Sequence, residues 1–182
     1  MPEKPFNLAS DSKARVHLSL GSNLGPRARH LRMALPMLSN AGVRILRSSK
    51  VYESKPLEDA GPRWFLNCVL ECETSLSPME LLEHIHEIEF RAGRPMPPRQ
   101  RSRPRTLDID ILFWDNLQIS TRHLVIPHLS WRSRTFVLRG LSDLWPLGEI
   151  PGTRLTWLPG PHVPDPDINI SRIQLDLQVE PS

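Results

Sequence analysis

Hydrophobic and polar positions form a series of short periodic segments along the chain. Val16, Leu18 and Leu20 alternate with polar residues and predict a first strand, and residues 106–114 repeat that alternation. Branched residues over 43–53 and an apolar run over 64–74, bounded by turn residues, predict two further strands. Apolar residues at helical spacing predict helices over residues 27–39 and 77–93, the second opened by the capping box Ser77-Pro78-Met79-Glu80.

The order strand, helix, strand, strand, helix, strand is typical of one fold class. We predict an α+β protein with a ferredoxin-like antiparallel sheet, its helices packed on one face. A further short strand over 120–128 and a helix over 135–145 follow. Prolines recur from Pro151 onward and predict a Pro-rich C-terminal extension. The predicted division is a flexible N-terminal extension at 1–14, one domain at 15–148 and the tail at 149–182.

Bulk composition excludes several classes of protein. Hydrophobic residues make up 39% and charged residues 24% of the 182 residues, as in globular proteins. No apolar run approaches the roughly 18 residues of a membrane span, and the N-terminal segment lacks the features of a secretory signal. Cys68 and Cys72 have neither zinc-site nor C-x-x-C spacing and are interpreted as buried free thiols. A cytoplasmic location with no membrane partner is therefore expected.

Positive charge is concentrated in one segment although the net charge is only +3. Six arginines and no acidic residue lie between Arg91 and Arg105. Such a segment repels itself unless it meets anions, which indicates phosphate or nucleic acid. Composition alone leaves a solvated basic loop as an equal alternative.

Two aspartates interrupt the strand that follows the arginines. Leu107, Ile109, Ile111 and Phe113 are predicted to face one way, and Asp108 and Asp110 the other way with Leu112 and Trp114. Carboxylates two residues apart on a strand, about 6.6 Å at the backbone, can converge on Mg²⁺. Hard-cation ligands beside arginines are what phosphoryl transfer requires. The alternative is a polar sheet face with two solvated acids. No GxxxxGK[ST] loop is present.

Three other polar residues are candidates for binding. His128 and Arg134 could donate to phosphate oxygens, and Asn67, inside an apolar run, could hydrogen-bond the edge of a heterocycle. Taken alone, each is also compatible with a structural role.

Several motifs together resemble one family. Gly21-Ser22-Asn23-Leu24, Phe65-Leu66-Asn67, Glu89 with Gly93-Arg94, residues 104–110 (PRTLDID) and Val125-Ile126-Pro127-His128 match the 6-hydroxymethyl-7,8-dihydropterin pyrophosphokinases in order and spacing. The similarity covers roughly residues 15–145. The family's fold agrees with the element order, and its reaction transfers diphosphate from ATP to the pterin hydroxymethyl group in folate biosynthesis, releasing AMP.

The resemblance implies a role for each matching residue. Asp108 and Asp110 correspond to ligands of two Mg²⁺ ions, and Arg101 and Arg105 to catalytic arginines that hold the triphosphate. The implied ATP-binding residues are these two arginines with Glu89, Arg94, His128 and Arg134. The implied pterin-binding residues are Leu57, Phe65, Asn67 and Phe136. The expected partners are the two small-molecule substrates rather than nucleic acid, and a monomer is the default expectation.

Two alternatives to an active enzyme are left open. Ser102 replaces a frequent tryptophan, and the arginine loop is one residue longer and richer in proline, which motivates a non-catalytic relative that binds pterin or nucleotide. An RNA-binding module also uses an antiparallel sheet, but it would expose aromatic residues where this strand carries aspartates.

Overall fold

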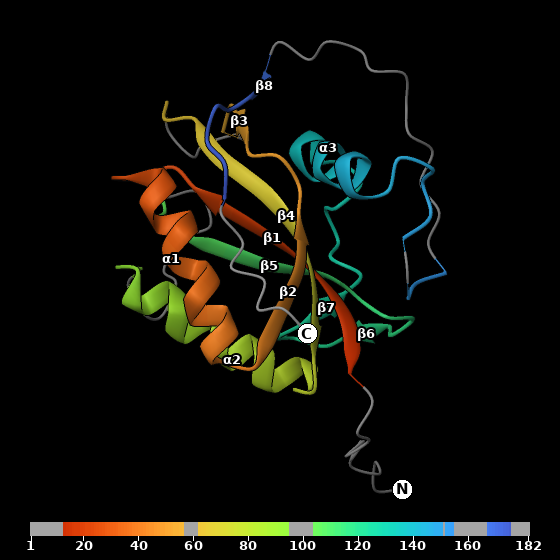
Figure 1. The fold of residues 1–182 in the computed structure, drawn as a ribbon. Coiled ribbons are helices and arrows are strands. Elements are labelled where there is room, and N and C mark those ends of the chain that lie inside the picture. Colours follow the sequence, from red (N-terminus) through yellow and green to blue (C-terminus); the bar gives the residue numbers. More distant parts are fainter. Residues whose placement is uncertain (1–12, 57–61, 95–103, 151, 155–166, 176–182) are drawn as a thin grey trace, which may run out of the picture.

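The computed structural model describes residues 13–56, 62–94, 104–150, 152–154 and 167–175. Within these ranges the chain forms eight strands and three helices (Figure 1). In chain order they are β1 (Ala14–Ser22), α1 (Arg27–Asn40), β2 (Val43–Ser48), β3 (Tyr52–Ser54), β4 (Phe65–Thr74), α2 (Pro78–Arg91), β5 (Asp108–Trp114), β6 (Ile119–Ser120), β7 (Val125–Ile126), α3 (Thr135–Leu144) and β8 (Ile168–Ile170).

One antiparallel sheet organises the chain and confirms the predicted α+β class. Its strands run in the order β5-β1-β4-β3-β8, with β2 also paired to β4, while β6 and β7 form a separate pair. The strand predicted over residues 43–53 is divided into β2 and β3. At the break, the Ser49 hydroxyl accepts the Val69 N–H at 2.9 Å, and the Ser49 N–H donates to the Val69 carbonyl at 2.8 Å.

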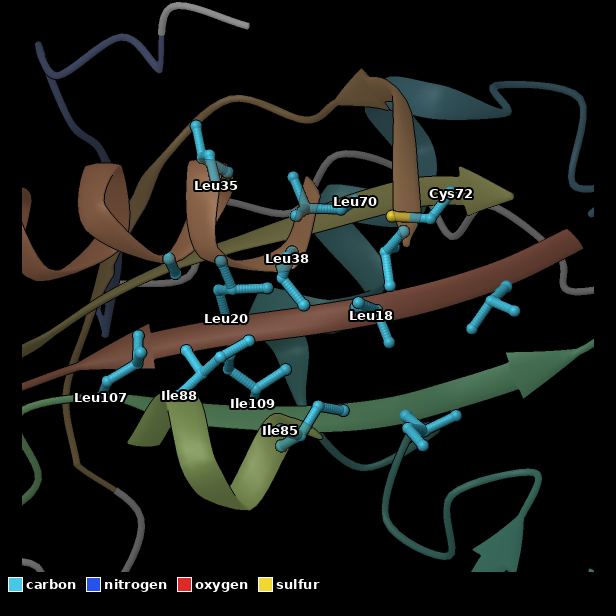
Figure 2. Close-up of a cluster of buried hydrophobic side chains, with 14 of the residues drawn as sticks. Leu18, Leu20, Leu35, Leu38, Leu70, Cys72, Ile85, Ile88, Leu107 and Ile109 are labelled. Carbon is cyan, nitrogen blue, oxygen red and sulfur yellow. The ribbon is translucent and has the colours of Figure 1, made fainter. Parts of the chain in front are cut away.

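The larger apolar core lies between the sheet and the helices α1 and α2. Alternate residues of β1 and β4 point into it, and the i, i+3, i+4 positions of both helices cover them (Figure 2). Full burial of each such side chain contributes about 1.5–3 kcal/mol. Its members include Leu18, Leu20, Leu35, Leu38, Leu70, Cys72, Ile85, Ile88, Leu107 and Ile109.

The prediction that the helices pack on one face is wrong for the third helix. α3 lies on the face opposite α1 and α2 (Figure 1). Its buried residues Val137 and Leu141 pack with Val69, Phe113 and Trp131 in a second apolar cluster. The physical reason lies in β4, whose central residues are buried on both faces of the sheet. A strand that is apolar on both sides needs cover on both sides.

A β-bulge changes the direction of two aromatic side chains. His17 pairs with Phe113, but the next residue, Leu18, pairs with Ile111, which leaves Leu112 as an extra residue in β5. Phe113 therefore joins the α3 cluster, and Trp114 joins the α1–α2 core. The strict alternation expected from the sequence places both on the wrong face.

The chain after α3 returns to the sheet. β8 lies within the predicted 149–182 tail and pairs with β3, and Ile173 and Leu175 pack against the α1–α2 core. None of the helices in the described part of the chain is both long enough and apolar enough to cross a membrane.

His17 is a buried histidine without a hydrogen-bond partner on either ring nitrogen among the described residues. Its ring contacts Phe113 and Trp145 edge to face. Burial, with smaller contributions from Arg15 and Arg47, lowers the pKa of His17 from 6.5 to about 3. The His17 ring is therefore neutral in the folded protein near pH 7.

We expect His17→Leu to flatten the acid side of the stability profile. Between pH 6.5 and 3 the unfolded chain binds more protons than the folded chain, so the wild-type free energy of unfolding falls as pH falls through this window. The contribution of His17 is on the order of 5 kcal/mol over the full window. Urea unfolding from pH 7 to pH 3.5 measures it, and a variant with the wild-type slope would contradict the assignment.

Candidate active site

Strand pairing brings the candidate residues together on the face of the sheet away from α1 and α2. Asp108 lies opposite Gly21 in β1, and Gly21 lies opposite Asn67 in β4. Asp110 lies opposite Ser19 in a neighbouring row. Adjacent strands are about 4.8 Å apart, so the backbones at Asp108 and Asn67 are roughly 10 Å apart across the sheet. The two acids and the asparagine thus belong to one surface.

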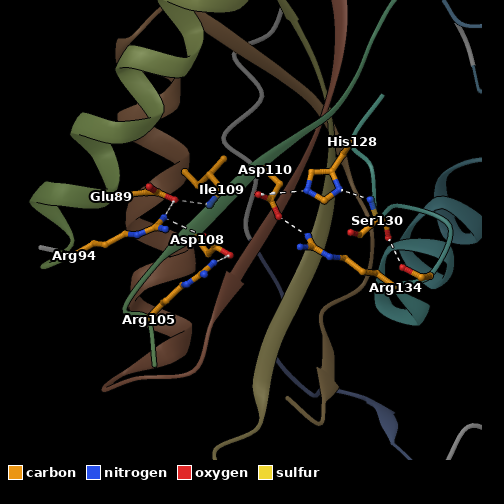
Figure 3. Close-up of polar contacts among 10 residues, drawn as sticks. Glu89, Arg94, Arg105, Asp108, Ile109, Asp110, His128, Ser130 and Arg134 are labelled. Atoms are coloured by element: carbon orange, nitrogen blue, oxygen red, sulfur yellow. Dashed lines mark hydrogen bonds and ion pairs between the residues drawn. The ribbon is translucent and has the colours of Figure 1, made fainter. Parts of the chain in front are cut away.

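Asp108 is held by two arginines (Figure 3). Arg94 Nη1 lies 3.0 Å from one carboxylate oxygen, and Arg105 Nη1 contacts the other. Burial raises the pKa of Asp108 above its ordinary value, and repulsion from Asp110 acts in the same direction. The two guanidinium groups oppose that rise and favour the charged form.

Glu89 connects the end of α2 to the edge of the sheet. Its Oε1 accepts the backbone N–H of Ile109 at 2.9 Å and also contacts Arg94 Nη1 (Figure 3). Burial raises the pKa of Glu89 to about 7, and Asp108 adds to the rise, while Arg94 and the Ile109 N–H oppose it. Arg94 therefore bridges two carboxylates, and this bridge fixes the start of the arginine-rich segment beside β5.

Asp110 faces a second pair of basic groups. Arg134, the residue before α3, contacts one carboxylate oxygen, and His128 Nε2 lies 3.9 Å from the other. His128 Nδ1 accepts the Ser130 N–H at 3.1 Å, so in the neutral ring the proton is on Nε2 and faces Asp110. Burial lowers the pKa of His128, with Arg134 adding to the effect and Asp110 opposing it.

Asn23 positions the backbone of Arg105. The Asn23 side-chain oxygen accepts the Arg105 N–H at 2.6 Å, while the N–H groups of Asn23 and Leu24 donate to the Arg105 carbonyl at 3.0 and 3.1 Å. The Gly21-Ser22-Asn23 motif predicted a turn but gave no role to its asparagine. The role depends on a contact between residues 82 positions apart, which no local pattern reveals.

Asn67 is oriented from two sides. Its Nδ2 donates to the Ser54 hydroxyl at 2.8 Å. A Cβ atom at Gly21 would lie 2.8 Å from Asn67 Oδ1 and 3.7 Å from a ring carbon of Phe65. Any residue larger than glycine would therefore clash with the Asn67 amide in its observed position. Ser54 and Gly21 are therefore contacts of the predicted heterocycle-binding residue that the sequence did not indicate.

The remaining predicted site residues are two aromatic residues, one leucine and one arginine. Phe65 begins β4, and Phe136 lies in the first turn of α3, with the Arg134 guanidinium 5.9 Å from the centre of its ring. Leu57 and Arg101 lie outside the described residues, as does Ser102, and their predicted roles remain predictions.

Asp108 and Asp110 are the candidate ligands for Mg²⁺. No group of three or more His, Cys, Asp or Glu side chains within the described ranges is arranged to hold a metal. Mg²⁺ in phosphate-transfer sites, however, commonly takes one or two protein carboxylates and completes its shell with water and substrate phosphate. Asp108 and Asp110 supply oxygen ligands on one sheet face, beside arginines that suit the phosphate. The donor set fits.

The fold and the site define an α+β protein whose sheet carries paired carboxylates and arginines suited to a polyphosphate. The sequence profile of the 7,8-dihydro-6-hydroxymethylpterin-pyrophosphokinases (HPPK) matches residues 17–146. The chain belongs to this family.

Individual relatives show the same similarity. A 2-amino-4-hydroxy-6-hydroxymethyldihydropteridine pyrophosphokinase of Bacillus subtilis is 39% identical over 130 residues, which are 71% of this chain and 77% of the relative. The enzyme of the same name from Methylorubrum extorquens is 38% identical over 133 residues, 72% and 83% of the two chains. A crystal structure of wild-type Plasmodium falciparum HPPK-DHPS with pteroate superposes with a TM-score of 0.61 at 15% identity. That match covers 80% of this chain but 43% of the Plasmodium chain and shows likeness of fold.

Proposed function

We propose that this protein transfers the terminal diphosphoryl group of ATP to 6-hydroxymethyl-7,8-dihydropterin. The hydroxymethyl oxygen forms a bond to the β-phosphorus, and the bond from that phosphorus to the oxygen bridging the α- and β-phosphates breaks. AMP leaves with the bridging oxygen, and the hydroxyl proton passes to solvent. Family membership supports this reaction, together with the relatives' names.

The observation that carries the proposal is the row Asp108–Gly21–Asn67 across three neighbouring strands. A flat heterocycle held by Asn67 with its hydroxymethyl group toward the acids would fit this row, because the separation of roughly 10 Å is about the length of a bicyclic ring with its substituent and a phosphate. Acceptor alcohol and phosphate would then meet on one rigid surface, which lowers the entropy cost of the reaction.

Each group near the acids has a defined contribution. Asp108 and Asp110 would hold Mg²⁺, which neutralises phosphate charge when bound. Arg94, Arg105 and Arg134 can donate to phosphate oxygens as the charge redistributes, and the neutral His128 can donate from Nε2. Arg101 is predicted to act with them.

Product analysis tests the proposal directly. The purified chain is incubated with ATP, Mg²⁺ and 6-hydroxymethyl-7,8-dihydropterin, and AMP and pterin diphosphate are quantified. Equal amounts of the two products are expected, with none when Mg²⁺ is chelated. ADP with pterin monophosphate would contradict diphosphoryl transfer. Binding of both substrates without AMP would favour the non-catalytic relative.

We expect Gly21→Ala to weaken pterin binding selectively. The new methyl group would lie 2.8 Å from Asn67 Oδ1 and push the amide out of its hydrogen bond with Ser54. Loss of one oriented hydrogen-bonding group should raise the KM for the pterin roughly 10- to 100-fold. The KM for ATP should change little. In an Asn67→Ala background the same substitution should add almost nothing, and additive effects would show that it acts elsewhere.

We also propose a ferredoxin-like sheet and a cytoplasmic location for this protein. The order β5-β1-β4-β3, with β2 and β3 sharing one strand position, supports a ferredoxin-like assignment for the sheet. The two buried free thiols, Cys68 and Cys72, fit a reducing cytoplasm, where we place the reaction.

A further inference from the structure

The C-terminal strand β8 lies outside the segment that matches the family, yet it is part of the main sheet. The family match ends at residue 146, and β8 spans Ile168–Ile170. It pairs antiparallel with β3 (Figure 1). Two backbone hydrogen bonds bracket the pairing, from Lys55 N–H to the Asp167 carbonyl at 2.9 Å and from Ser171 N–H to the Val51 carbonyl at 2.8 Å.

The register places Ile168 beside Ser54. In an antiparallel pair, hydrogen-bonded and non-hydrogen-bonded residue pairs alternate. The two bracketing bonds therefore make Glu53–Asn169 a hydrogen-bonded pair and Ser54–Ile168 a non-hydrogen-bonded pair. Side chains of such a pair share one face of the sheet and lie close together, with Cα atoms about 4.5 Å apart.

That face is the one that carries the candidate site. The Ser54 hydroxyl accepts the hydrogen bond from Asn67 Nδ2 at 2.8 Å, and Asn67 lies in the row that leads to Asp108. Ile168 thus borders the serine that orients Asn67.

Burial distinguishes Ile168 from its neighbour on the same strand. Ile168 is 8% exposed, whereas Ile170, which points to the same face beside Tyr52, is 61% exposed. Ile168 belongs to neither apolar cluster of the described residues. Its buried side chain therefore lies beside Ser54 without joining either core.

We infer that β8 is a positioning element for the pterin end of the site and that Ile168 is its positioning residue. Pairing with β8 turns β3 from an edge strand into an inner one, and Ile168 restricts the movement of Ser54. Asn67 keeps its orientation because Ser54 keeps its place. The inference rests on the proposed function, since it assigns Asn67 to the pterin.

Two matched isoleucines test the side chain. Ile168→Ala is expected to raise the KM and Kd for 6-hydroxymethyl-7,8-dihydropterin roughly tenfold, with the KM for ATP within about twofold of wild type. Ile170→Ala removes the same atoms from the same strand and should leave all three constants unchanged. Pterin Kd is measured by calorimetry with a non-hydrolysable ATP analogue, and thermal unfolding is recorded for each variant.

A second pair of variants tests the strand pairing. The alternation directs the Asn169 N–H toward Glu53 and the Ile170 N–H away from β3, toward the side of β8 on which no described strand pairs. Asn169→Pro should therefore break the pairing and reproduce the rise in pterin KM. Ile170→Pro removes no pairing bond and should behave as wild type.

The outcomes separate this inference from the proposed function. A wild-type chain that forms no AMP would contradict the proposed function alone, and the calorimetric Kd values would still test the role of β8. An active wild type with equal pterin constants for Ile168→Ala and Ile170→Ala would overturn the inference. A parallel rise of the pterin and ATP constants in Ile168→Ala would overturn it too, because that pattern describes a general loss of structure.

Discussion

Replacement of Asp110 or Asp108 by asparagine is expected to lower kcat by at least about 10³-fold. The substitution keeps the shape of each side chain but removes one of two carboxylates that would hold Mg²⁺, and the loss of metal-based charge neutralisation is worth several kcal/mol in the transition state. Initial rates of AMP formation at saturating ATP and pterin measure the effect. Pterin binding should persist, because Asn67 lies two strands away from Asp108.

Glu73→Gln supplies a matched control for these variants. Glu73 is also a carboxylate contacted by two arginines, Arg15 and Arg44, and lies on the same strand as Asn67. It is six residues farther along β4, or about 20 Å from the site. The kcat of Glu73→Gln should equal that of wild type. Near-normal turnover by Asp110→Asn would contradict the metal role assigned to these acids.

Arg105→Ala is the second substitution with a large expected effect, a fall in kcat of about 10²–10⁴-fold with pterin binding intact. The Arg105 guanidinium contacts Asp108, and Asn23 and Leu24 fix its backbone, so the arginine is held beside the proposed phosphate site before any phosphate arrives. Preorganised donors of this kind stabilise transition-state charge strongly. Arg105→Lys should recover only part of the rate, because it restores the charge without the planar fork.

Arg91→Ala controls for the removal of a nearby positive charge. Arg91 makes an exposed ion pair with Glu87 one turn earlier on α2, and such pairs contribute little. Single-turnover rates and pterin affinity should both match wild type. Equal loss of pterin binding in Arg105→Ala would point instead to collapse of the turn held by Asn23.

Local patterns in the sequence were sufficient for most of the helices and strands and for the direction of the key acids. The alternation around Asp108 and Asp110 placed them together on one sheet face, as the register shows. The capping box at Ser77 marked the start of α2, and both of its hydrogen bonds are present. These features depend on residues within a few positions of one another, which is why they can be read from the chain alone.

Features that depend on distant partners could not be read in this way. The bulge at Leu112 requires the pairing with β1, and the side of the sheet chosen by α3 depends on which strand faces remain uncovered. β8 has three residues in a proline-rich segment, too few for a periodic signal. The Ser54–Asn67 and Asn23–Arg105 contacts likewise appear only once the sheet has assembled.

The ion pairs of the site imply a thermodynamic linkage between nucleotide and cation. Arg94 and Arg105 occupy the oxygens of Asp108, and Arg134 occupies one oxygen of Asp110. In the proposed site, phosphate bound by these arginines would loosen their ion pairs and leave carboxylate oxygens for a cation, and a cation on the acids would in turn make the arginine donors available to phosphate. Each ligand therefore exposes the groups that the other needs. Affinity for the pair should exceed the product of the separate affinities, and neither Mg²⁺ nor metal-free ATP should bind well alone.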